Sequence, residues 1–371
     1  MLFEENETFK AATCGVVLEN EYILWSSWEN GDLYKIYLKD NRIEFVSSTI
    51  KAGHYGKAFG CMIRNEEKIY LVCLFDCYEI MEYDIRTGML RLLYQHIMEG
   101  LQIFHSFLIE GKMYLLPNKL SETMCIYSLE DGEAIYVKWK ELLSDINFSI
   151  EDEYVHYIDC LGKNIYGTIY NTPYTFCIET SPILRCKVER LQKNYKLTNI
   201  NVIEGKRYFI PANRELVLCL NRNLEIEEIK LFQDKENVYG KHQFVSSAIY
   251  KNDIFLIPFS RDDKITVINR FNGNKKVLEY PKEFEVINEN GRLFWIPIIY
   301  KDKIYLLPHC GSGILVLDLY TYKMNYIGWE LKLNIILKYR LLGDMVEKQE
   351  LERQDIGHII YKDCVKESIA R

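Results

Sequence analysis

Histidine is the residue type in this chain whose placement most suggests chemistry. The chain has seven histidines, and four of them, His54, His105, His156 and His242, lie at or just before the start of an apolar, strand-like segment. An imidazole can transfer a proton near neutral pH, hydrogen-bond a ligand or coordinate a metal ion. If these segments are equivalent strands of a repeat, their histidines gather at one end of the fold, where we expect a binding site.

Other polar and aromatic residues are expected beside the histidines. Some lie at the same strand starts, and others lie in the loops that follow the next strand of each repeat. The further site residues predicted from these two sets are Tyr55, Trp295, Asn118, Arg214, Arg261 and His309. Aromatic side chains with convergent polar groups are typical of a binding pocket. Because Lys119, Arg214 and Arg261 are cations of the same loops, we expect a polar or anionic ligand.

Three interpretations of the histidine pattern stay open at this point. The first is a ligand or partner pocket, and the second is a set of structural histidines that bond only to neighbouring loop carbonyls. The third is a metal or catalytic centre, for which Asp76 is the best-placed loop carboxylate. No metal-ligand spacing accompanies the histidines, and the nucleotide-binding, nucleophile-elbow and zinc-protease motifs are absent. We therefore predict no metal and no cofactor.

A repeated strand must position these residues. The segment Lys303–Pro308 is apolar and aromatic and ends in proline, and Lys112–Pro117 is nearly identical. Aligned aromatic residues recur at Tyr22, Tyr70, Tyr114, Tyr166, Tyr208, Phe255 and Tyr305. The steps between them are 48, 44, 52, 42, 47 and 50 residues. A strand-based period of roughly 40 to 50 residues is typical of a β-propeller. The sequence predicts an all-β fold, a seven-bladed β-propeller of four-stranded blades, with six blades as the alternative because the first repeat is the weakest match.

Short turns support this division of the chain. In each repeat the first two strands are joined by two residues, often Gly, Asn or Asp, which tolerate the positive φ angles of a tight hairpin. The predicted turns are Glu19-Asn20, Asn65-Glu66, Glu110-Gly111, Gly162-Lys163, Glu204-Gly205, Lys251-Asn252 and Lys301-Asp302. The remaining connections are longer and more varied, so we expect function on the opposite face of the ring.

The second repeat resembles a kelch repeat. Its strand Lys68-Ile69-Tyr70 is followed by Tyr83-Asp84-Ile85-Arg86-Thr87-Gly88, and Asp318 with Thr321 repeats the second part. The glycine doublet of kelch repeats is replaced by Leu-Pro or Ile-Pro in four repeats, so the chain is similar to kelch proteins without being a standard member. The resemblance implies a propeller that binds another protein, since few kelch-like propellers are enzymes.

Charge and cysteine content restrict the class of partner. The net charge is −7, with 46 basic and 53 acidic residues interspersed, which argues against nucleic acid and against a polybasic membrane anchor. No run of 18 apolar residues predicts a membrane helix, and the first residues do not resemble a signal peptide. Eleven cysteines without a CxxC pair indicate reduced thiols. We expect a cytoplasmic protein.

Two segments fall outside the predicted blades. Residues 1–330 are assigned to the propeller and residues 331–371 to a C-terminal tail. Within the tail, Gln354–Arg371 has apolar residues at helical spacing and predicts an amphipathic helix that covers the ring or docks on a partner. At the other end, Met1–Lys10 is predicted to add an outer strand to the last blade and latch the ring.

These patterns lead to one preferred function and two alternatives. We expect a non-catalytic binding or scaffold propeller that recognises a protein or a small polar ligand at the histidine-lined mouth of its central channel. The first alternative is a propeller enzyme, a lyase or hydrolase, that acts on a sugar- or peptide-like substrate in the same mouth. The second is a structural subunit that its tail helix recruits to a complex.

Overall fold

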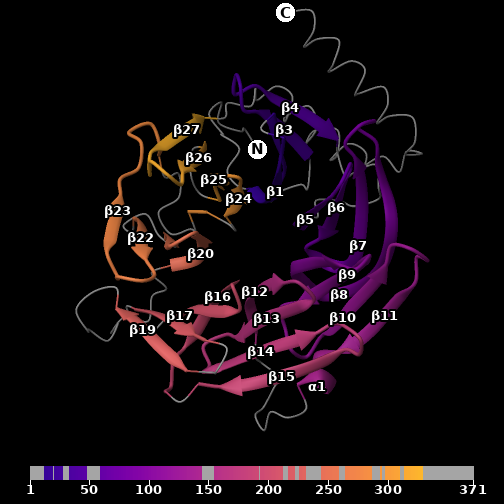
Figure 1. Cartoon of the computed structure of the whole chain (residues 1–371). Coiled ribbons are helices and arrows are strands. Elements are labelled where there is room, and N and C mark those ends of the chain that lie inside the picture. Colours follow the sequence, from indigo (N-terminus) through magenta and orange to yellow (C-terminus); the bar gives the residue numbers. More distant parts are fainter. Residues whose placement is uncertain are drawn as a thin grey trace, which may run out of the picture.

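The computed structural model describes residues 12–19, 21–27, 33–47, 59–143, 154–191, 193–211, 216–221, 225–230, 244–258, 264–285, 293–294, 297–309 and 313–328. Their strands form six antiparallel sheets that follow one another around a ring (Figure 1). The predicted all-β fold of repeated sheets is confirmed. The predicted N-terminal strand and C-terminal helical tail lie outside the described residues. No helix in the described part of the chain is long and apolar enough to span a membrane.

Five of the sheets contain four strands each, in the order of the sequence. The first comprises β1 (Ala12–Leu18), β2 (Tyr22–Ser27), β3 (Leu33–Tyr37) and β4 (Ile43–Ser47). The third comprises β12 (Val155–Leu161), β13 (Asn164–Ile169), β14 (Tyr174–Glu179) and β15 (Arg185–Arg190). The fourth comprises β16 (Leu197–Ile203), β17 (Lys206–Pro211), β18 (Leu216–Leu220) and β19 (Ile226–Lys230). The fifth comprises β20 (Phe244–Tyr250), β21 (Asp253–Pro258), β22 (Ile265–Asn269) and β23 (Lys275–Leu278). The sixth comprises β24 (Ile298–Tyr300), β25 (Lys303–Leu306), β26 (Gly313–Asp318) and β27 (Met324–Gly328).

The second sheet has seven strands because one long strand belongs to two repeats. Its strands are β5 (Phe59–Asn65), β6 (Lys68–Cys73), β7 (Phe75–Asp84), β8 (Leu90–Ile109), β9 (Lys112–Pro117), β10 (Thr123–Ser128) and β11 (Ala134–Lys138), followed by the short helix α1 (Trp139–Leu142). The first part of β8 pairs with β7, and the part from Ile103 to Ile109 pairs with β9. The sequence predicted separate four-stranded blades, but β8 continues from one repeat into the next through Gly100, the only residue of this strand with a positive φ.

The aligned aromatic residues occupy equivalent places in these sheets. All seven lie on the strand that pairs with an inner strand, namely β2, β6, β9, β13, β17, β21 and β25. Six are buried, and Tyr166 is partly exposed. A large aromatic side chain suits this position because it fills the space between two neighbouring sheets.

Packing between sheets closes the ring. The described apolar side chains form seven clusters, and one of them joins Val17 and Trp25 of the first sheet to Tyr305 and Leu307 at the other end of the chain. A Cβ atom at Gly15 of β1 would lie 2.6 Å from Leu307 Cδ1, so glycine permits this close approach. Among the described strands, none of the first sheet pairs with one of the last. Side-chain packing therefore joins the two ends.

The hairpin turns between inner strands and their partners share one backbone conformation. The first turn residue has a φ between 47° and 63° in every repeat, at Glu19, Glu66, Glu110, Gly162, Glu204, Lys251 and Lys301. In the second repeat the predicted turn Asn65-Glu66 is wrong by one residue. Asn65 pairs with Lys68 as the last residue of β5, which places the turn at Glu66-Glu67.

The turns that carry the kelch-like residues are fixed by an aspartate. Asp84 Oδ1 accepts hydrogen bonds from the Thr87 N–H at 2.7 Å and the Thr87 hydroxyl at 2.9 Å. Asp318 accepts the same two bonds from Thr321, both at 2.8 Å. The backbone N–H and the hydroxyl of the threonine lower the pKa of each carboxyl group because they stabilise its ionised form.

We predict that Tyr305→Ala lowers the free energy of unfolding by about 3–5 kcal/mol, because it empties space in the cluster that joins the two ends of the chain. Chemical denaturation monitored by fluorescence measures the change. Phe271→Ala is the control, since Phe271 is 67% exposed and its truncation should cost less than about 0.5 kcal/mol. A loss below about 1 kcal/mol for Tyr305→Ala would show that this seam is peripheral to stability.

We predict that Asp84→Ala lowers the melting temperature at pH 7. The folded-state pKa of Asp84 is below its ordinary value of 3.8, so its stabilising effect is present above that pH and is lost as pH falls through the folded-state pKa. The difference between variant and parent should narrow below about pH 4. Asp84→Asn should lower the melting temperature by less than Asp84→Ala does, because an asparagine can make similar bonds. In the turn that follows β22, Asn269 Oδ1 accepts hydrogen bonds from the Phe271 and Asn272 N–H groups. An equal decrease in melting temperature at pH 7 and at pH 3 would contradict a stabilising role for the ionised Asp84 carboxylate.

Candidate functional site

A β-bulge recurs on the inner strands. The pairing register of six inner strands shifts at Ala12/Cys14, Phe59/Cys61, Ile103/His105, Val155/Ile158, Leu197/Asn199 and Phe244/Ser246. Each bulge inserts an extra residue and redirects the side chains that follow it. The bulge lies where each inner strand begins to pair with the next strand of its repeat, which in β8 is at Ile103, so it sets which of the following side chains face the ring axis.

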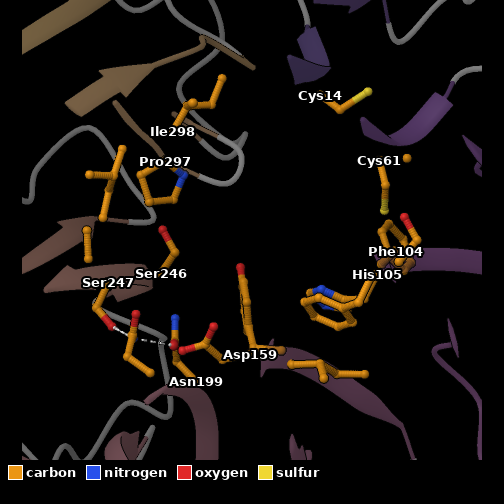
Figure 2. A pocket seen from close by; sticks show the side chains of 18 of the residues that line it. Cys14, Cys61, Phe104, His105, Asp159, Asn199, Ser246, Ser247, Pro297 and Ile298 are labelled. Carbon is orange, nitrogen blue, oxygen red and sulfur yellow. Dashed lines mark hydrogen bonds between the residues drawn. The ribbon is translucent and has the colours of Figure 1, made fainter. Parts of the chain in front are cut away.

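The redirected residues surround one cavity. The residue four places before the end of each of these strands is Cys14, Cys61, His105, Tyr157, Asn199 or Ser246. All six line a cavity of about 390 Å³, to which every one of the seven inner strands contributes. Figure 2 shows His105 and Cys61 on one wall and Ser246 and Ser247 on the facing wall. The cavity therefore occupies the central channel of the ring.

One arc of the cavity wall is polar. It runs from His105 on β8 through β12 and β16 to Ser246 on β20. Asn201 Nδ2 donates hydrogen bonds to Asn199 Oδ1, at 3.2 Å, and to Ser247 Oγ. The hydroxyl of Ser246 is buried and has no hydrogen-bond partner among the described residues. We name this wall the polar arc.

Asp159 supplies the negative charge of the polar arc. Its Oδ1 accepts the Cys160 N–H at 2.8 Å, and its Oδ2 accepts the Val202 N–H of the next sheet at 2.5 Å. In the described part of the chain no lysine or arginine forms an ion pair with it. Burial raises the pKa of Asp159 above its ordinary value, although the two N–H groups oppose the rise.

The opposite arc is largely apolar. It is formed by Met62, Pro297, Ile298 and Leu307 with the two cysteines of the inner-strand series, and Phe104 and Phe107 lie where it meets the polar arc. Cys14 Sγ donates to the Phe59 carbonyl at 3.2 Å. Burial raises the pKa of Cys61 to about 12, so its thiol stays protonated at neutral pH. A thiolate nucleophile is therefore not expected at Cys61.

The described wall of the cavity carries few charged side chains. Among the described residues that line it there is one carboxylate, Asp159, and neither lysine nor arginine. No three His, Cys, Asp or Glu side chains of the described residues are grouped as metal ligands. The arrangement can donate and accept hydrogen bonds on one side and bury an apolar group on the other.

The structure places the predicted site residues in different environments. His105 lines the cavity and its ring lies 6.1 Å from that of Tyr157. His156 lies on β12, but the place equivalent to His105 is held by Tyr157, one residue later. The predictions for His54, Tyr55, Arg214, His242, Arg261 and Trp295 fall outside the described residues and stay predictions.

Asn118 and His309 do not line the cavity. Asn118 is buried, and its backbone bonds to the Gln102 carbonyl at 3.0 Å and the Val155 N–H at 2.7 Å, so it connects neighbouring repeats. The His309 N–H donates to the Leu293 carbonyl at 2.8 Å. The loop cation Lys119 lies 4.0 Å from Glu122 and also does not line the cavity.

Most residues of the polar arc were not predicted from the sequence. Asp159, Asn199, Asn201 and Ser246 were not selected because the residue types at these positions differ from repeat to repeat. A signal was nevertheless present in the sequence. In the first six repeats, counting back five residues from the first residue of the predicted hairpin turn reaches the cavity-lining residue, once the second turn is shifted by one.

Known proteins share the fold of this chain without close sequence similarity. No protein-family model and no curated protein matches the sequence. A streptogramin B lyase structure has a TM-score of 0.60 at 11% identity over 87% of this chain and 96% of its own. Virginiamycin B lyase from Staphylococcus aureus has a TM-score of 0.58 at 10% identity, covering 83% of this chain and 95% of its own. YCF48 bound to D1 peptide has a TM-score of 0.61 at 9% identity, covering 84% and 93%. This chain therefore has a β-propeller fold.

We predict that Cys61 resists alkylation by iodoacetamide at pH 8. With a pKa of about 12 its thiolate fraction is smaller than that of an ordinary cysteine, so its reaction should be slower by roughly a thousandfold. Mass spectrometry of time points measures the rate at this residue. The same cysteine in guanidinium chloride is the control and should react at an ordinary rate. Equally fast reaction in the folded protein would show that the thiol is not shielded.

Proposed function

We propose that this protein is a non-catalytic binding propeller that holds a small amphipathic ligand, or a short end of a partner's chain, in its central channel. The observation that carries the proposal is the division of one cavity into a polar arc around Asp159 and an apolar arc around Ile298. Such a cavity can orient a ligand that has a polar group and an apolar body. Its volume of about 390 Å³ is within the usual range for small-molecule sites.

The proposal includes the finer architecture expected from the sequence. Seven blades are supported by the seven apolar clusters, with the two halves of the seven-stranded sheet counted as separate blades that share β8. A kelch-like character is supported by the Asp84–Thr87 and Asp318–Thr321 turns. The C-terminal helix and the cytoplasmic location rest on the sequence, and free thiols at all nine described cysteines support the latter.

A protein partner is part of this proposal. One propeller with a similar fold, YCF48, was solved bound to a peptide. In this chain the channel would take only a terminus or one side chain, and the remaining contacts would come from the loops around it. Residues near His105, at the mouth that the sequence predicts to be lined by histidines, would then also contact the partner.

An enzyme is the second candidate, and one observation favours it. His105, Tyr157 and Asp159 line the same side of the cavity, and a histidine near a partly buried carboxyl group of raised pKa is suited to proton transfer. Two propellers of similar fold are lyases by name. The enzyme would be a lyase or hydrolase that acts on a sugar- or peptide-like substrate. It would convert the bound compound into a product, whereas a binding protein would release it unchanged.

The proposal is tested by soaking crystals in a library of small amines, acids, alcohols and amides. We expect fragments to occupy the channel cavity more often than any other place, with their polar groups toward the polar arc. Occupancy only at outer surfaces would contradict a channel site. Mass spectrometry of the soaked compounds separates a binding protein, which leaves them unchanged, from an enzyme.

A matched pair of variants controls for non-specific binding. Ser247→Phe places a ring beside Asn201 in the cavity wall and should abolish channel occupancy. Val277→Phe adds the same kind of bulk on the outer strand β23, where Val277 is 51% exposed, and should leave occupancy unchanged. Both variants should retain the melting temperature within a few degrees, which distinguishes a blocked channel from an unfolded one.

A further inference from the structure

We infer that the channel selects a protonated amine attached to an apolar body, rather than the anionic ligand that the loop cations predict from sequence. This inference rests on the proposed function and names the class of ligand for the same cavity. Its evidence is the charge and hydrogen-bonding capacity of the described cavity wall.

Charge is the first argument. Asp159 is the one carboxylate among the described lining residues, and no lysine or arginine of the described chain neutralises it. Burying a carboxylate without a cationic partner is unfavourable, and an incoming ammonium group would restore the balance. A ligand carboxylate or phosphate would instead meet a like charge at short range in a medium of low dielectric constant.

Hydrogen-bond acceptors are the second argument. Asn201 Nδ2 already donates hydrogen bonds to Asn199 and Ser247, so the Asn201 side chain can offer its amide oxygen to a ligand as an acceptor. Ser246 is 2% exposed, and its hydroxyl has no partner among the described residues. A primary ammonium has three donors and no acceptor, which matches a wall that offers a carboxylate, an amide oxygen and hydroxyl oxygens. Figure 2 shows Asp159, Asn199 and Ser246 on neighbouring parts of this wall.

The aromatic and apolar residues are the third argument. Phe104, Phe107 and Tyr157 line the same cavity as Asp159, and aromatic faces attract organic cations. The apolar arc opposite them can bury a hydrocarbon or aromatic ring. A ligand with an ammonium group at one end and a ring at the other can contact both arcs at once.

A charge series on one molecular body tests the inference. Phenethylamine, 2-phenylethanol and phenylacetate share a phenyl ring and differ in the charge of the end group. Isothermal titration calorimetry at pH 7 should show phenethylamine binding at least tenfold more tightly than either of the others. Phenylacetate binding as tightly as the amine, or more tightly, would overturn the inference and leave the channel-binding function standing.

Asp159→Asn tests the origin of the preference. It keeps the size of the side chain and an acceptor oxygen but removes the charge, so the tenfold preference for the amine should disappear. Asp84→Asn is the matched control, because it makes the same change in an outer turn and should leave the preference intact. If Asp159→Asn does not fold, Ser246→Ala is tested in its place. We expect this variant to bind phenethylamine more weakly than the parent and to bind 2-phenylethanol with unchanged affinity. A preference that survives in the folded variant would overturn the role of Asp159.

The source of the ammonium group is distinguished by a peptide pair. Phenylalanyl-glycinamide with a free amino terminus and its N-acetylated form carry the same ring. Tighter binding of the free peptide than of phenethylamine assigns the site to a chain terminus, and the reverse order assigns it to a small amine. Equal binding of the acetylated and free peptides would overturn the inference. If none of these probes binds while other fragments occupy the cavity, the inference fails alone; an empty cavity in the fragment soak would refute the proposed function itself.

Discussion

The structure depends on the requirement that each sheet bury both of its faces. The strands next to the inner ones, such as Asp253–Pro258, are buried along almost their whole length, so each sheet needs a neighbour on either side. In a linear stack the two outer sheets would each expose an apolar face to water. In a ring every sheet has a neighbour on both sides, so no such face is exposed. Contact between Val17, Trp25 and Tyr305 closes that ring, and Gly15 lets Leu307 approach. Closure then holds the inner strands around one axis and creates the channel.

Within this regular scaffold the channel is irregular in its chemistry. The bulges present equivalent positions to the cavity, yet these positions hold cysteines in the first two repeats and Tyr157, Asn199 and Ser246 in later ones. Substitution at such positions changes the groups that a ligand can contact, because those residues line the cavity. The polar arc and the apolar arc are the result, with Asp159 as the charged residue that determines the preferred end group.

The repeat could be predicted from sequence because it rests on local patterns. Strings such as Lys112–Pro117 identify buried strands, and residues such as Gly162 identify the hairpin turns. The continuity of β8 could not be predicted, since Gly100 in a polar stretch is equally typical of a loop. The cavity was not predicted either, because the residues that follow the bulges differ in type from repeat to repeat, and only their constant distance from the hairpin turns marks them. Matching histidines by their nearness to strand starts selected His105, which lines the cavity, and His156, which lies one residue before the equivalent position.

The claim that the channel is the binding site is tested most directly by methionine methyl NMR. Met62 lines the apolar arc, whereas Met89 is 66% exposed on the outer surface. With methyl-labelled protein, titration of phenethylamine should shift the Met62 signal in a saturable way through the ring current of the bound phenyl group. The Met89 signal should stay where it is. Saturable binding that moves Met89 and leaves Met62 unchanged would contradict the account.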